Sequence, residues 1–375
     1  MWDVVIIGAG PAGCSAALAA RRARPKASVL LLDRATFPRD KACGDGIAPH
    51  AIDVLRDLGV PWHFPRYRPV RSLQLSSGPE HVARDMRRDA WVVPRVDFDD
   101  YLLRQAQEAG VSVVRQRVRS VRRLATSIVV DDCVQAAVVI AADGAHSEVR
   151  RVSGDNLGTS GPTALALRGY APTPRQRRGK QVIAFSSIRQ PAYGWSFDRG
   201  DGWSNVGYGE VMPKATTRPP LRKAMMIDHL ERLLPGATTS AQSWRAAPLP
   251  LSGPGFAHPR GRLLYVGDAA HLVNPLTGEG IYYAVLTGAL AGQVAVSAAL
   301  DPGGAYRANV RRQLLAHFRT TTTVSRLARS PSLLRFGLRA AAARQSVFDD
   351  VVEIGLGSGV VTASLLKATA RHGWR

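Results

Sequence analysis

Short continuous apolar runs alternate with helical patterns along this chain. Residues 3–7 read Asp-Val-Val-Ile-Ile, a pattern typical of a strand that is buried on both faces, as in a parallel sheet. An Ala-rich segment predicts a helix from about Cys14 to Arg24, and residues 28–32 predict a second strand. Residues 138–142 and 262–266 are further apolar runs. This order of elements predicts an α/β domain around a parallel sheet.

A glycine-rich turn joins the first predicted strand to the first predicted helix. Gly8, Gly10 and Gly13 form a GxGxxG pattern, and Asp33 ends the second strand. In this context the glycines permit a tight turn, a close approach to a pyrophosphate and close helix packing, while the helix N-terminus attracts the anion. The acidic residue favours a ribose with a free 2′-hydroxyl, which predicts FAD or NAD and disfavours NADP.

The two later strands each end on an aspartate. Asp143 and Gly144 follow one strand, and Asp268 follows the other. Ligands of open α/β sheets bind at this edge, so the aspartates are candidate cofactor contacts. The next segment holds three more candidates, Pro275, Gly278 and Gly280. The helix predicted after them directs its N-terminus at this site, which suits negative charge on the pyrimidine edge of a reduced flavin.

One uncharged stretch, residues 281–300, is long enough to cross a bilayer. Ala and Gly dominate it, and it contains Gln293 and follows the candidate cofactor loop directly. We therefore interpret it as a buried helix that packs on the sheet through Gly288 and Gly292.

Charge and cysteine content narrow the class of protein. The chain has 50 Lys+Arg against 29 Asp+Glu, a net charge of +21, which fits a membrane surface or an anionic substrate. No zinc-finger, RNP-like or basic-region pattern accompanies this charge, so nucleic acid is not an expected partner. Three scattered cysteines and no leader-like start predict reduced thiols and a cytoplasmic protein. The histidines show no metal-ligand spacing, so no metal site is expected.

Two further segments complete the pattern. They are Lys41-Ala42-Cys43-Gly44-Asp45-Gly46 and Ala192-Tyr193-Gly194-Trp195-Ser196-Phe197. With the glycine and aspartate motifs, the chain resembles flavoproteins of the para-hydroxybenzoate hydroxylase-like fold. Within that fold, residues 1 to about 300 are similar to the geranylgeranyl reductase family, whose members reduce double bonds of prenyl chains. The resemblance implies bound FAD.

The resemblance also assigns roles to residues. It implies that Gly8, Gly10, Gly13 and Asp33 hold the ADP part of FAD, that Asp143 supports the pyrophosphate region and that Asp268 binds the ribitol. Arg95 matches a position near FAD at the start of a helix. Arg34 and Lys41 complete the expected cofactor contacts. NADPH or NADH would bind only transiently as electron donor, because the chain has no second GxGxxG.

Reducing an unactivated double bond requires a hydride and a proton donor in a site closed to water. Cys43 is a candidate proton source or positioning group, with the charge of Lys41 favouring thiolate; the alternative is a packing residue in a tight turn. Tyr193 and Trp195 alternate on a predicted strand and so face one side, over the substrate pocket or in an ordinary core.

We therefore expect an α/β (α+β) protein with a Rossmann-type FAD-binding domain, an antiparallel-sheet substrate domain and a C-terminal helical region. The expected boundaries are 1–75, 95–160 and 255–300 for the first, 76–94 and 161–254 for the second, and 301–375 for the third. Residues 302–375 hold twelve Lys/Arg and three Asp/Glu, which predicts amphipathic helices that cover a substrate tunnel, rest on an anionic membrane or form an ordinary basic surface.

The leading function is FAD-dependent saturation of carbon–carbon double bonds in a hydrophobic, prenyl-type lipid or quinone. The alternative is an FAD-dependent monooxygenase of an aromatic or polycyclic secondary metabolite, since the same motifs serve both reactions. A third alternative is a non-enzymatic flavin-bearing redox sensor or membrane-associated binding protein.

Overall fold

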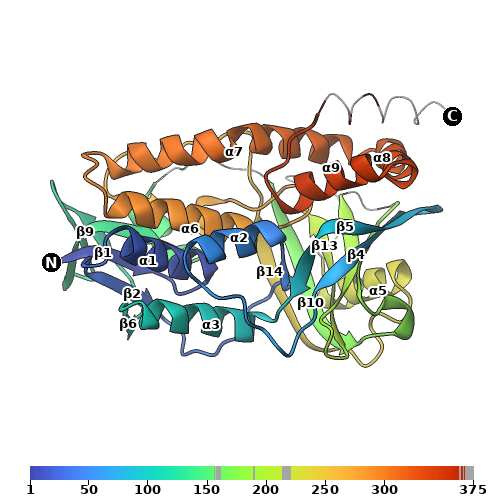
Figure 1. The fold of residues 1–375 in the computed structure, drawn as a ribbon, viewed down its shortest axis with the longest axis horizontal. Coiled ribbons are helices and arrows are strands. Elements are labelled where there is room, and N and C mark those ends of the chain that lie inside the picture. The colour runs from blue at the N-terminus through green and yellow to red at the C-terminus, as the bar shows by residue number, and fades with distance from the viewer. Residues whose placement is uncertain are drawn as a thin grey trace.

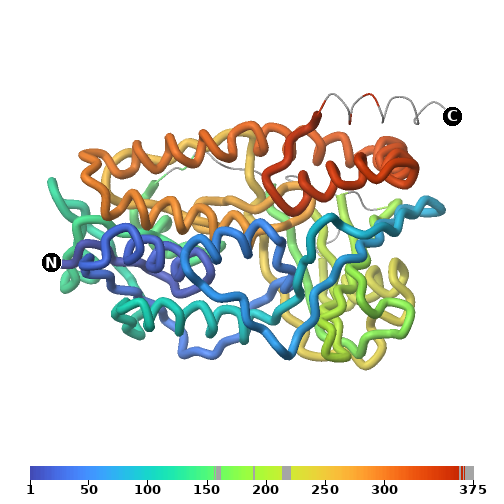
Figure 2. The backbone as a smooth tube through the Cα atoms, in the orientation of Figure 1, coloured from blue at the N-terminus to red at the C-terminus, as the bar shows by residue number. Residues whose placement is uncertain are grey.

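The computed structural model describes residues 1–155, 157, 162–188, 191–212, 221–362, 365 and 367. Two β-sheets lie next to each other along the long axis of the molecule, with helices packed around them (Figure 1). The chain crosses between the two halves several times: residues 70–92, in light blue, lie with the second sheet, and residues 95–150, in teal and green, return to the first (Figure 2).

The first sheet is the expected parallel core with an antiparallel extension. Its order is β6-β2-β1-β9-β8-β7, with β15 beside β9. Strands β1, β2, β6, β9 and β15 are parallel, whereas β7 and β8 pair antiparallel. The strands are β1 (Trp2–Ile7), β2 (Val29–Asp33), β6 (Ser112–Arg115), β7 (Val121–Arg123), β8 (Ile128–Val130), β9 (Val134–Ala141) and β15 (Leu263–Tyr265). Residues 4–7 are almost fully buried, which explains the unbroken apolar run.

The uncharged stretch forms α6 (Ile281–Ala295), which packs along α1 (Pro11–Ala23). A β-carbon at Gly288 or Gly292 would lie 2.1 Å from a backbone carbonyl oxygen of α1. The expectation that these glycines pack on the sheet was wrong: they bring two helices together. No helix among the described residues is both long and apolar enough to span a bilayer.

The second sheet has the order β14-β10-β13-β12-β11-β4-β5-β3 and is antiparallel except where β4 pairs with β11. Its strands are β3 (Gly46–Ile47), β4 (Val70–Ser77), β5 (Glu80–Val92), β10 (Thr163–Pro172), β11 (Lys180–Phe185), β12 (Ala192–Asp198), β13 (Trp203–Val211) and β14 (Gln242–Pro250). The expected boundary at residue 75 falls inside β4, which runs from Val70 to Ser77, and β3 brings the chain to the second sheet before that.

Among the described residues after 300, the chain forms α7 (Pro302–Leu327), α8 (Pro331–Ala343) and α9 (Gln345–Leu356). Helix α7 runs beside α6, and α8 and α9 lie against β4 and β5 (Figure 1). Arg339 on α8 pairs with Glu80 on β5 at 2.6 Å, and Arg87 on β5 pairs with Asp349 on α9 at 2.7 Å. The remaining helices are α2 (Pro49–Asp57), α3 (Arg95–Glu108), α4 (Glu148–Ser153), α5 (Lys223–Leu233) and the short 3₁₀ turns Arg175–Arg177 and Gly267–Ala270.

Candidate active site

A cavity of about 630 Å³ connects the edge of the first sheet to the second sheet and the C-terminal helices. At one end it reaches the cofactor motifs, including Gly10, Arg34, Gly144 and Asp268. Beyond them it is bordered by apolar side chains from β4, β11, β12, α8 and α9: Leu73, Leu75, Ile183, Phe185, Trp195, Leu338, Val351, Val352 and Leu356. The cavity therefore joins a polar end to an apolar end.

The glycine turn has the geometry that an anion site requires. Gly8 has a φ of +107°, and a β-carbon there would lie 2.3 Å from the carbonyl oxygen of Ala142. No side chain caps the N-terminus of α1, so its free N–H groups stay available. Asp33 accepts hydrogen bonds from the backbone N–H of Ala9 at 2.7 Å and of Ala35 at 2.8 Å, which fixes its carboxylate beside this turn.

Two arginines flank the glycine turn. Arg95 begins α3, as expected, and donates two hydrogen bonds, of 2.6 and 2.7 Å, to the buried carboxylate of Asp99. Arg39 also pairs with Asp99, at 3.0 Å. A β-carbon at Gly10 would lie 3.6 Å from one guanidinium and 3.8 Å from the other. Two positive charges on one carboxylate leave an excess of +1 beside the N-terminus of α1. The i,i+4 spacing of Arg95 and Asp99 in the sequence indicated their ion pair. No sequence pattern indicated that Arg39 would join it.

Lys41 crosses the cofactor end of the cavity. Its Nζ lies 3.7 Å from Oδ2 of Asp268, and a β-carbon at Gly144 would lie 3.5 Å from the same Nζ. Asp143 accepts hydrogen bonds from the hydroxyl of Ser147 at 2.7 Å and from the N–H of Val149 at 3.0 Å, so its carboxylate caps α4. Lys41, Gly144 and Asp268 are thus together in one place.

Cys43 lies in a loop held by the second sheet. Its carbonyl oxygen accepts a hydrogen bond of 2.8 Å from the side-chain amide of Asn205, which donates another of 2.8 Å to Asp45. Burial raises the pKa of the Cys43 thiol, while Arg95 opposes the rise. The expectation that Lys41 would favour thiolate was wrong, because Lys41 faces Asp268 and the thiol stays protonated at neutral pH.

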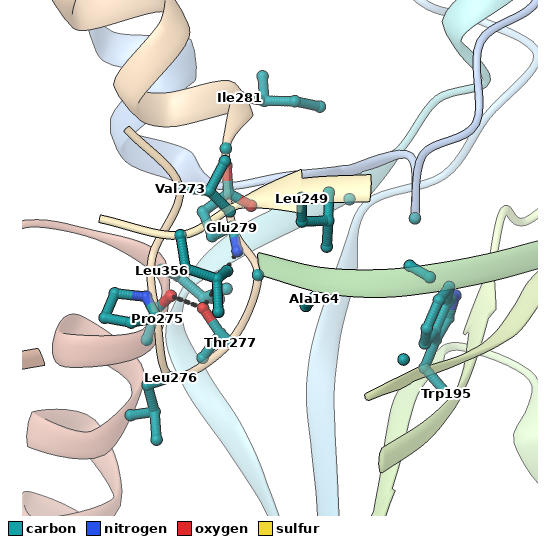
Figure 3. A pocket seen from close by; sticks show the side chains of 18 of the residues that line it. Ala164, Trp195, Leu249, Val273, Pro275, Leu276, Thr277, Glu279, Ile281 and Leu356 are labelled. Carbon is teal, nitrogen blue, oxygen red and sulfur yellow. Dashed lines mark hydrogen bonds between the residues drawn. The ribbon is translucent and has the colours of Figure 1, made fainter. Parts of the chain in front are cut away.

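Tyr193 and Trp195 lie on one face of β12, as their alternation predicted, and that face borders the cavity. Tyr193 donates a hydrogen bond to the carbonyl oxygen of Thr277, and Trp195 donates one of 2.8 Å to Asn205. In Figure 3, Trp195 lies on the other side of the cavity from the loop that carries Thr277 and Glu279. The strand therefore supports the cofactor loop as well as the cavity wall.

The loop of residues 274–280 is bonded to the C-terminal helices, which the sequence did not indicate. Asn274 donates a hydrogen bond of 3.0 Å to the carbonyl oxygen of Ile354, and Thr277 donates one of 2.7 Å to that of Gly355. Ser325 of α7 donates one of 2.8 Å to the carbonyl oxygen of Pro275. The loop that contains Pro275, Gly278 and Gly280 is thus positioned from the apolar side of the cavity.

Two carboxyl groups with raised pKa values border the cavity, the half-buried Glu279 and the buried Asp45, and neither was a candidate site residue from the sequence. Burial raises the pKa of Glu279 to about 7; the N–H groups of Tyr282 and Ile281 oppose the rise and Asp268 adds to it. Burial also raises the pKa of Asp45 to about 6, against the hydrogen bond from Tyr170. A carboxyl group with a pKa near 7 is able to exchange protons at neutral pH.

The residues present fit FAD. A glycine turn with an uncapped helix N-terminus and two guanidinium groups suits a pyrophosphate, and Asp33 stands where a ribose would lie. Lys41 and Asp268 then lie between this site and the apolar end, in the order that the parts of FAD require.

Known proteins agree with this architecture. Residues 1–287 match the family of the FAD binding domain. A menaquinone reductase from Mycolicibacterium smegmatis is 35% identical over 326 residues, covering 79% of this chain and 76% of the relative. Digeranylgeranylglycerophospholipid reductase 1 from Methanopyrus kandleri is 30% identical over 317 residues, covering 79% and 81%.

The fold is also that of a solved structure, a geranylgeranyl bacteriochlorophyll reductase-like protein from Thermoplasma acidophilum. The two superpose with a TM-score of 0.80 at 20% identity, covering 99% of this chain and 96% of the other. The FAD motifs on strand ends, the antiparallel second sheet and the helical C-terminal part are all confirmed. The chain belongs to the geranylgeranyl reductase family of FAD-dependent oxidoreductases.

Proposed function

We propose that this oxidoreductase saturates carbon–carbon double bonds in the prenyl chain of a quinone or related lipid. The observation that carries the proposal is the cavity, which joins the cofactor motifs to an apolar region under α8 and α9. Burial of one five-carbon prenyl unit contributes at most about 4 kcal/mol, at about 0.8 kcal/mol per methylene. The names of the relatives, a menaquinone reductase and a digeranylgeranylglycerophospholipid reductase, support a prenyl substrate.

The chain's own residues supply positioning, exclusion of water and a proton. Bound FAD supplies the hydride. The arginines at Gly10, with Asp33 and Asp268, hold FAD, and the apolar wall holds the prenyl chain and excludes water. The protonated thiol of Cys43 is the proton donor to the second carbon. Glu279 borders the same cavity, and its pKa of about 7 lets it exchange protons at neutral pH. Tyr193 and Trp195 position the substrate side of the site.

The competing function is an FAD-dependent monooxygenase of an aromatic or polycyclic metabolite, because it would use the same cofactor residues. A monooxygenase requires oxygen, whereas a double-bond reductase does not. The apolar side chains of the cavity wall favour the reductase, since a flexible prenyl chain needs many apolar contacts and few hydrogen bonds.

An anaerobic single-turnover experiment separates the two functions. Chemically reduced enzyme is mixed with a prenylated naphthoquinone, the ring is then reoxidised in air, and the product is analysed by mass spectrometry. Air oxidation of the ring is essential, since ring reduction alone also adds two hydrogens. We expect a product two hydrogens heavier in its prenyl chain. A product that gains an oxygen atom, formed only in air, would establish the monooxygenase instead.

We also propose that the cavity takes its substrate from a membrane surface. Leu327 at the end of α7 and Leu333 on α8 border the cavity and are 53% and 45% exposed. Arg326 and Arg329 are exposed beside Leu327. Exposed leucines flanked by arginines are the arrangement that binds the interface of an anionic bilayer.

A further inference from the structure

A single glutamine interrupts the apolar wall of the cavity. Gln181, Ile183 and Phe185 alternate along β11 and all border the cavity. Gln181 lies opposite Leu73 of β4 on one side and Phe197 of β12 on the other. Only 4% of Gln181 is exposed. Within the part of the chain that the structure describes, its side-chain amide makes no hydrogen bond, although such an amide has two donors and an acceptor.

The amide lies at the end of the wall nearest the Cys43 loop. Its Nε2 is 4.0 Å from the position that a β-carbon of Gly46 would occupy, and the ring of Phe197 is 3.9 Å from the same position. Of the polar groups nearby, Trp195 is bonded to Asn205, and Tyr170 is bonded to Oδ2 of Asp45 at 2.6 Å, whereas Oδ1 of Asp45 is buried without a partner. The amide borders the cavity, where a ligand that excluded water without offering a polar group would leave it without a partner; a polar group of the ligand avoids that cost.

The surroundings of the amide favour an uncharged ligand group. Leu73, Ile183 and Phe197 offer no counter-charge, and a buried phosphate without a counter-charge would be strongly unfavourable. A buried guanidinium on the same face of the sheet, that of Arg168, is paired with Asp40 and donates a 2.9 Å hydrogen bond to the carbonyl oxygen of Ser243. A carbonyl oxygen or a hydroxyl group matches the amide, which donates to the first and accepts from the second.

We propose that Gln181 binds an oxygen of the quinone ring that carries the prenyl chain. This inference rests on the proposed function and adds a specific role to it. When the ring is held at Gln181, the position of the prenyl chain along the cavity is fixed. The same double bond of the chain then always lies at the cofactor end of the cavity. Gln181 is then a specificity-determining residue: it favours prenylquinones over prenyl lipids with charged head groups.

Binding to the oxidised, FAD-loaded enzyme tests the inference without turnover. The variant is Gln181→Leu, with Gln181→Met as a second apolar replacement of similar length in case the first folds poorly. The control is Gln74→Leu on the neighbouring strand β4, because Gln74 pairs with Val182 and so lies on the opposite face of the sheet. The two probes are a prenylated naphthoquinone and the prenylated naphthalene of equal chain length, which lacks the ring oxygens.

We expect Gln181→Leu to weaken binding of the quinone by about fivefold to tenfold and to leave binding of the naphthalene unchanged or tighter. Gln74→Leu should alter neither affinity. In turnover, the variant should also reduce a mixture of double bonds where the wild type reduces one, which mass-spectrometric fragmentation detects. A purely structural role of Gln181 would change both probes equally and would not change the position of reduction.

Two results would overturn the inference. One is equal affinity of wild type and variant for the quinone. The other is a shift of the flavin absorption maximum in Gln181→Leu without any change in the preference for quinone over naphthalene, which would show that the amide contacts the cofactor. If the wild type reduces no prenyl double bond but still shows the Gln181-dependent preference, the proposed reaction fails and the binding role of Gln181 stands.

Discussion

The carboxylate of Glu279 accepts a hydrogen bond of 2.8 Å from the backbone N–H of Tyr282, in the first turn of α6. The sequence predicted a helix N-terminus here that suits negative charge on the pyrimidine edge of a reduced flavin. The protein instead supplies a carboxyl group of its own at that position, and Asp268 raises its pKa further. The charge at this helix end therefore depends on the protonation state of Glu279.

Replacing Glu279 with Gln should change how stability depends on pH. The pKa of Glu279 is raised from 4.5 to about 7 in the folded protein, so the folded state binds more protons than the unfolded chain between these values. Its contribution to stability is complete below about pH 4.5 and is lost as the pH rises through 7. The stability of wild type relative to Glu279→Gln should fall by about 2 kcal/mol from pH 5 to pH 8. Urea unfolding of both proteins at the two pH values measures this; a difference that is independent of pH would contradict it.

Replacing Asp268 with Ala should release FAD. Removing a carboxylate from the cofactor end of the cavity eliminates a charge-assisted hydrogen bond, which weakens FAD binding by about tenfold or more. The control is His271→Asn, since His271 has a φ of +57° and Asn tolerates that conformation. The ratio of flavin to protein absorbance after ultrafiltration measures retention. Equal retention by the two variants would place the ribitol elsewhere.

Cys43→Ser should retain FAD and lose turnover. Burial keeps the thiol protonated, and a serine hydroxyl of similar size is a much weaker acid, so we expect a decrease in rate of about a hundredfold. Cys133→Ser, at an exposed cysteine, is the matched control. Incorporation of solvent deuterium into the product should fall in parallel with the rate. Full activity of Cys43→Ser would show that the residue only packs the turn.

The cofactor half of the site was predictable because it depends on local sequence. The glycine turn, the aspartates at strand ends and Arg95 each follow from a short motif whose geometry is fixed by its own strand and helix. The partner of Lys41, by contrast, depends on how two distant segments meet. Cys43 is only two residues away in the sequence, yet the side chain of Lys41 lies 3.7 Å from Asp268. Local proximity was a poor guide there.

The links between the C-terminal helices and the cofactor loop could not be predicted. Thr277 bonds to the carbonyl oxygen of Gly355, and backbone carbonyls carry no sequence signal. Gln181 was missed for a different reason: one glutamine in a strand is ordinary, and only the pairing of β11 with β4 and β12 shows that it faces an apolar cavity.

The contact between α1 and α6 should be sensitive to a single methyl group. A β-carbon at Gly288 would lie 2.1 Å from the carbonyl oxygen of Ala12, so Gly288→Ala must separate the two helices and should destabilise the protein by about 2 to 3 kcal/mol. Gly337→Ala on α8 is the control, because a β-carbon there meets nothing within 4 Å and Ala favours a helix by up to about 1 kcal/mol. In urea unfolding, the free energy of unfolding should therefore fall for Gly288→Ala and rise for Gly337→Ala. Equal changes in the two variants would exclude the packing argument.

Membrane binding should depend on the exposed leucines at the cavity mouth. The double variant Leu327→Asn, Leu333→Asn removes apolar surface next to Arg326 and Arg329, so its binding to anionic phosphatidylglycerol vesicles should fall about tenfold or more. Val114→Asn is the control, since Val114 is 46% exposed but lies on β6, in the first sheet. The apparent KM of the double variant should rise for a long-chain prenylquinone presented in vesicles and stay unchanged for a short, water-soluble analogue. Sedimentation with vesicles at low and high salt separates the apolar from the ionic contribution. If the wild type and the double variant sediment equally, the leucines line only the cavity and the substrate enters by another route.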